Sequence, residues 1–130
     1  MQFILFAITY PIIWVLSRLP MRILYIKSDF FYFLIYYVFR YRKQVVLDNL
    51  KLAFPEKPEV ELLQIRKKFF KYLMDLLVES VKAFSISEKE ILKRYTYSNP
   101  ELVNKYAAEG RSIALMGAHQ SNWEWSISLP

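Results

Sequence analysis

His119 is the only histidine in this chain of 130 residues, and it lies five residues before Glu124 in segment 117–125. Many enzymes use a histidine held by a carboxylate to remove a proton from a hydroxyl group. The carboxylate fixes the tautomer of the ring and stabilises the imidazolium, so the other ring nitrogen acts as the general base. No serine nucleophile is needed if the base acts directly on a substrate hydroxyl.

The spacing of five does not identify such a pair by itself. On a regular helix it corresponds to about 500° of rotation, which would splay the two side chains. A histidine in a turn and a glutamate in the first turns of the next helix would instead bring carboxylate and imidazole together. Spacing alone therefore favours the alternative, a solvent-facing histidine and an unrelated glutamate.

The elements expected around His119 would place it where α/β proteins have their active sites. Residues 112–118 (SIALMGA) are a short apolar run that predicts a buried strand. Residues 123–129 have a helical pattern, so His119 would lie between a strand end and a helix N-terminus, where free N–H groups bind anions. This predicts an α/β fold class. Because one strand cannot form a sheet, we expect the remaining strands beyond Pro130.

Upstream of this unit the sequence predicts helices. Helical spacing and end signals indicate helices at 42–54, 59–84, 87–95 and 99–109. Ser87 followed by Glu90 is typical of a capping box, and Gly110 would end the last helix in the left-handed conformation. These helices must position the segment that carries His119.

Two apolar stretches precede these helices. Residues 3–17 are slightly short for a spanning helix of about 20 residues, yet we expect a membrane anchor there, with a buried core helix as the alternative. Residues 30–39 suit a helix in the membrane interface, because tyrosines favour the headgroup level; a packed core helix is the alternative. Basic residues follow the first stretch, which places the rest of the chain on the cytoplasmic side.

Composition narrows the partners. Apolar residues make up 55% of the chain and its net charge is +6, so it suits a membrane, an anionic lipid or an acidic protein. Nucleic acid is not expected, because the basic residues are scattered among apolar helices and form no known nucleic-acid motif. The absence of cysteine excludes a disulfide scaffold.

The motif also resembles a known family. His119-x4-Glu124 matches the His-x4-Asp/Glu signature of the lysophospholipid acyltransferase superfamily, and Asn122-Trp123-Glu124-Trp125 resembles the branch that contains the lipid A biosynthesis acyltransferases. The resemblance extends over nearly the whole chain through Leu19-Pro20, Tyr41-Arg42, Asn49-Leu50, Phe54-Pro55, and Asp75 with Glu79. The ordered set is more specific than the short motif, and it outweighs the alternative favoured by spacing.

The resemblance implies an enzyme of the bacterial inner membrane, with its catalytic part on the cytoplasmic side. Such enzymes transfer a fatty acyl chain from acyl carrier protein to a hydroxyl of a lipid A precursor during lipopolysaccharide biosynthesis. His119 would deprotonate that hydroxyl and Glu124 would orient His119, with direct attack on the thioester and no acyl-enzyme. No metal or cofactor is implied beyond acyl carrier protein as carrier of the co-substrate.

Further site residues are weaker candidates. Asn122 and Arg42 are candidate substrate-binding residues. The acidic carrier protein would suit a basic surface, although a solvated helix face also explains these residues: Arg66, Lys67, Lys68 and Lys71.

The expected organisation has three parts. Residues 1–19 form the anchor, residues 20–111 a helical membrane-facing region, and residues 112–130 the start of an incomplete α/β acyltransferase domain. Family members are longer and carry further motifs downstream. Two alternatives remain open: an acyltransferase for a lysophospholipid, aminolipid or glycolipid acceptor, and a membrane-bound helical module without catalytic activity.

Overall fold

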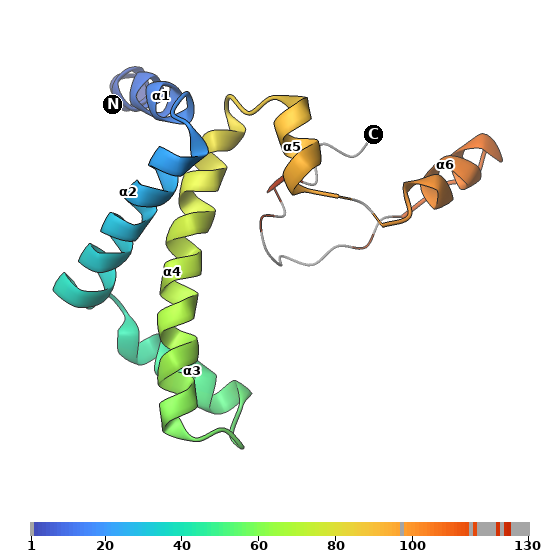
Figure 1. Cartoon of the computed structure of the whole chain (residues 1–130). Helices are drawn as coiled ribbons and strands as arrows, with labels where there is room; N and C mark the ends of the chain where they lie inside the picture. The colour runs from blue at the N-terminus through green and yellow to red at the C-terminus, as the bar shows by residue number, and fades with distance from the viewer. Residues whose placement is uncertain (1, 97, 115, 117–121, 123, 126–130) are drawn as a thin grey trace.

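A computed structural model describes residues 2–96, 98–114, 116, 122 and 124–125 of the chain (Figure 1). Within these residues the regular elements are α-helices and one π-helical turn. They are α1 (Gln2–Ser17), α2 (Met21–Phe33), η1 (Leu34–Val38), α3 (Lys43–Ala53), α4 (Glu59–Ala83), α5 (Glu88–Arg94) and α6 (Pro100–Ala108).

The predicted α/β fold class is wrong for the part of the chain that the structure describes. Ser112, Ile113, Ala114 and Met116 have no regular structure, and none of the described residues belongs to a strand. A strand needs a neighbour to pair its backbone N–H and C=O groups, and the described residues contain no second strand to provide one. Of the helix expected at 123–129, the described residues Glu124 and Trp125 lie in a 3-10 turn.

The predicted helices after residue 42 are confirmed as α3 to α6, within one residue at every end. Their end signals are local. Of the predicted capping box at Ser87 and Glu90, the serine half is present, whereas the Glu90 carboxylate accepts a hydrogen bond from Arg94 Nε at 2.9 Å. The Ser87 hydroxyl accepts a hydrogen bond from the Glu90 N–H at 3.4 Å at the start of α5. Gly110 follows α6 with a φ of 69°, the left-handed conformation that glycine adopts without strain.

Helices α2 and α4 form an antiparallel pair that is the centre of the structure (Figure 1). Leu24 of α2 and Phe70 of α4 are each only 2% exposed. The Ser28 hydroxyl donates to Asp75 Oδ1 at 2.6 Å across the same interface. Helix α3 packs along the first half of α4 and α1 packs at its last turns. The long helix α4 is therefore the common support of the others.

Most of the apolar side chains of helix α1 are exposed and do not cover this core. Phe3 is 80% exposed, and Ile4, Leu5, Phe6 and Ile8 are more than half exposed. The alternative of a buried core helix is thus wrong for the described structure. No single described helix is long and apolar enough to cross a membrane. Helix α1 and the segment from Met21 to Val38 meet those criteria only together, and they are bent by 119° at the break between them.

The second apolar stretch, residues 30–39, is split between the end of α2 and η1. Tyr36 is 2% exposed and packs its ring against Phe70 with centroids 5.5 Å apart. Its neighbours Phe33, Val38 and Phe39 are exposed. The stretch therefore contributes one side chain to the core while most of the others face outward, and its place in the membrane interface stays a prediction.

Candidate active site

The segment that carries the candidate pair is described at Asn122, Glu124 and Trp125, whereas His119 lies outside the described residues. The backbone N–H of Trp125 donates to the backbone carbonyl oxygen of Asn122 at 3.2 Å, which closes a short turn around Glu124. Asn122 and Trp125 are both 5% exposed, and Glu124 is exposed. The turn therefore has two buried anchors, with the candidate carboxylate between them.

The first anchor is polar. Asn122 Nδ2 donates to Glu79 Oε2 of α4 at 2.9 Å, and the Tyr25 hydroxyl of α2 donates to Glu79 Oε1 at 2.7 Å. Burial, together with the hydrogen bond to Glu79, raises the pKa of Tyr25 to about 12. The phenol, which is protonated at neutral pH even at its ordinary pKa, therefore stays a donor to Glu79 well into alkaline solution. Glu79 joins three segments that lie far apart in the sequence.

The second anchor is apolar. Trp125 packs in a cluster with Met21 and Leu24 of α2 and Val78 of α4. Aromatic side chains of this size bury a large apolar area, which drives association. The turn is therefore docked on the α2–α4 pair, near the end of α4.

Glu124 projects from the docked turn as an exposed carboxylate. An ionised carboxylate is an acceptor, so it suits the orientation of a neighbouring imidazole N–H. The predicted contact between Glu124 and His119 lies outside the described residues and stays a prediction.

Arg42 lies at the other end of the helical pair. It is exposed, has a φ of 47°, and precedes the first residue of α3. Next to it, the Lys43 carbonyl accepts from Arg66 Nη1 at 3.4 Å. Arg66 and Glu79 are thirteen residues apart on α4, which corresponds to about 20 Å along a helix. The structure does not bring Arg42 near the docked turn.

The four basic candidates on α4 do not share one environment. The Arg66 guanidinium faces η1 and α3, with Nη2 3.4 Å from the Tyr36 hydroxyl. Lys71 forms an ion pair with Asp29 of α2 at 3.2 Å. Lys67 and Lys68 are exposed. Of the predicted carrier-binding set, these two lysines are the ones most available to a soluble partner.

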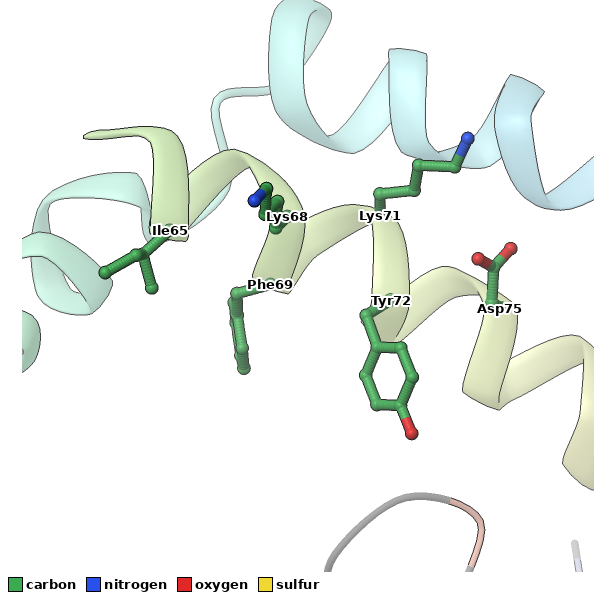
Figure 2. Close-up of a pocket in the computed structure, with 6 residues that line it drawn as sticks. All are labelled: Ile65, Lys68, Phe69, Lys71, Tyr72 and Asp75. Atoms are coloured by element: carbon green, nitrogen blue, oxygen red, sulfur yellow. The ribbon is translucent and has the colours of Figure 1, made fainter. Parts of the chain in front are cut away.

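Two of the grooves in the described structure lie along the middle and the end of α4. Figure 2 shows the first, of about 490 Å³, in which Phe69 and Tyr72 point to one side of the helix while Lys71 extends towards α2; its walls also include Ile65, Lys68 and Asp75. The second, of about 420 Å³, is almost entirely apolar and lies between α1, α2, η1 and α4. It is lined by Leu16, Leu24, Lys27, Phe31, Ile35, Met74, Leu77, Val78 and Val81. Leu24 and Val78 also contact Trp125, so this second groove adjoins the docked turn.

Comparison with known families agrees with the family resemblance of the sequence. The model of the family "Bacterial lipid A biosynthesis acyltransferase" matches residues 2–129. The chain belongs to this family. The matched range includes every element from α1 to the docked turn, and it confirms the resemblance inferred from the sequence. None of the curated proteins and none of the solved structures matches the chain.

Family membership makes this an acyltransferase chain with a lipid acceptor. The structure gives contacts to two residues that the sequence named only as part of the resemblance. Asp75 and Glu79 lie four residues apart on α4, and both accept hydrogen bonds from α2. Two carboxylates on a helix face that otherwise buries apolar residues are the sequence signal for such contacts, because a carboxylate withdrawn from water needs hydrogen-bond donors.

Proposed function

We propose that the chain carries the first catalytic block of a membrane-bound O-acyltransferase that uses acyl carrier protein as donor. The acceptor is a hydroxyl group of a lipid A precursor. The observation that carries the proposal is the family match over residues 2–129, which includes both His119 and Glu124. The docking of Asn122 and Trp125 on α2 and α4 supports it, because a catalytic turn must be held on a rigid support.

In the proposed reaction His119 takes the proton of the acceptor hydroxyl while its oxygen attacks the thioester carbonyl. The carbon–sulfur bond breaks, and the leaving thiolate takes up the proton held by the His119 imidazolium, so the carrier leaves as a thiol and the base is regenerated. Glu124 orients the imidazole and stabilises the imidazolium formed during attack. The acyl chain is transferred in one displacement, with no covalent enzyme intermediate.

The two substrates would approach from different sides. The apolar groove between α1, α2, η1 and α4 suits a hydrocarbon chain, since its walls are apolar and it adjoins Trp125. The exposed apolar side chains of α1 suit contact with the inner membrane. The acidic carrier protein would approach from the cytoplasm, where Lys67 and Lys68 offer positive charge.

The test is acyl transfer by the whole protein with acyl carrier protein and lipid A precursor, together with the mass of lipid A from cells that express each variant. His119→Ala should lower turnover by about 100-fold or more, because general-base catalysis contributes factors of that size. Glu124→Gln should lower turnover to a similar degree, since an amide does not stabilise an imidazolium as a carboxylate does.

Glu101→Gln is the matched control, because Glu101 is an exposed glutamate of α6. It should retain wild-type turnover. Near-normal turnover of His119→Ala would refute the assignment of the base, and near-normal turnover of Glu124→Gln would remove Glu124 from the mechanism.

A further inference from the structure

Glu79, which is half-buried, and Asn122, which is buried, form a polar contact between residues that are 43 positions apart in the chain. Both oxygens of the Glu79 carboxylate accept a hydrogen bond, one from Asn122 and one from Tyr25. The Asn122 side chain uses its amide nitrogen in this contact, while its oxygen Oδ1 is buried without a partner among the described residues. The carboxylate therefore selects which end of the Asn122 amide faces α4.

This contact restricts the candidate catalytic residues on both sides of Asn122. His119 is three residues earlier, so its Cα lies within about 11 Å of the Asn122 Cα at about 3.8 Å per residue. Glu124 is two residues later and belongs to the turn closed by the Asn122 carbonyl oxygen. Fixing Asn122 to α4 thus fixes the middle of the His119–Glu124 segment.

We propose that Glu79 is a positioning residue for the acyl transfer, acting through Asn122 on the segment that holds His119 and Glu124. This inference rests on the proposed function of that segment. Glu79 touches neither substrate nor reacting atoms in this role. The Asn122 amide donates to the Glu79 carboxylate, to which the Tyr25 hydroxyl also donates. This contact holds the turn on the α2–α4 pair for catalysis.

The chemistry of the contact provides a test by exchange of donor and acceptor. Asn122→Asp replaces the donor by a second carboxylate 2.9 Å from the first, so the turn should be repelled from α4. Adding Glu79→Gln to that variant restores one donor and one acceptor, because the amide introduced at position 79 can donate to the carboxylate introduced at position 122. Glu79→Gln alone allows the Asn122 amide to rotate and present the oxygen that is unpartnered among the described residues of the wild type.

We expect Asn122→Asp to lower kcat at least about tenfold with KM for both substrates changed little, the pattern of a lost transition-state interaction. The double variant should recover most of that loss, and Glu79→Gln alone should be only mildly impaired. Ser28→Ala is the matched control. It removes the 2.6 Å hydrogen bond to Asp75 across the same helix pair but leaves the docked turn untouched, so kcat should stay at the wild-type value.

Hydrogen exchange of the peptide containing residues 119–125 reports docking independently of activity. Exchange should be faster in Asn122→Asp and return towards wild type in the double variant. A double variant with no more activity than Asn122→Asp overturns the positioning role, as does unchanged exchange in Asn122→Asp. If His119→Ala retains turnover, the proposed function fails instead, and the exchange data then still decide whether Glu79 holds the turn.

Discussion

Trp125→Ala is the substitution for which the structure predicts the clearest separation between folding and turnover. The Trp125 side chain is 5% exposed and packs on Met21, Leu24 and Val78. Truncation of a buried tryptophan costs about 3–5 kcal/mol. At about 1.4 kcal/mol per factor of ten, a loss of about 3 kcal/mol lowers the ratio of docked to undocked turn on the order of 100-fold.

The cost should fall on docking of the turn rather than on the whole fold. Helix α4 remains joined to α2 by the hydrogen bond from Ser28 to Asp75 and to η1 by the Tyr36–Phe70 ring contact. Far-ultraviolet circular dichroism should therefore be unchanged, while acyl transfer should fall at least about tenfold if docking is required for turnover.

The assay compares Trp125→Ala with two other variants. Trp125→Phe keeps an apolar ring and should retain most of the activity. Trp14→Ala truncates a tryptophan of α1 that is 43% exposed, so transfer activity should be affected far less. Wild-type turnover in Trp125→Ala would refute the reasoning, and so would a parallel loss of helical signal, which would mean that Trp125 supports the fold itself.

Two further predictions concern the surfaces. Ile4→Glu combined with Ile8→Glu places charge on two α1 side chains that are 63% and 59% exposed, and this double variant should no longer sediment with membranes. The control, Val60→Glu, places charge at a 69% exposed position on α4 and should still sediment with them. Continued sedimentation of the α1 variant would move the membrane contact elsewhere. Lys67→Glu combined with Lys68→Glu should raise KM for acyl carrier protein and leave kcat unchanged, because charge at an interface rim acts mainly on association.

The control for the lysine variant is the same charge reversal on α5. Lys89→Glu combined with Lys93→Glu changes the net charge equally at two exposed positions, yet should leave KM for the carrier protein unchanged. Equal effects of the two double variants would show that net charge, and not the α4 surface, governs the interaction.

The helices were predictable because their signals are local. Ser87 caps α5 through a backbone N–H three residues away, and Gly110 ends α6 by its own φ angle. Neither signal depends on distant parts of the chain. A strand depends on a partner that the sequence of one segment cannot specify, and this is why the predicted strand is wrong for its described residues, 112–114 and 116.

The candidate site was predictable only in part, for the same physical reason. The motif identified Glu124 and Asn122 by residue type and order. The Asn122–Glu79 contact joins positions in two elements 43 residues apart, and local spacing contains no information on it. Likewise, the sequence grouped Arg66 with its lysine neighbours, although only the packing of η1 and α3 shows that the guanidinium faces Tyr36.

The contact between α1 and α4 determines the height at which the docked turn would lie relative to the membrane surface. Lys82 Nζ donates to the carbonyl oxygens of Ser17 and Leu19 at 2.8 and 3.1 Å, which fastens the end of α1 to the last turns of α4. Lys82 is three residues beyond Glu79, or about 4.5 Å along the helix. If α1 rests in the outer layer of one leaflet, the turn is held at the height of the lipid headgroups. A hydroxyl on a headgroup could then be acylated without being lifted out of the membrane, and only the carrier protein would have to travel.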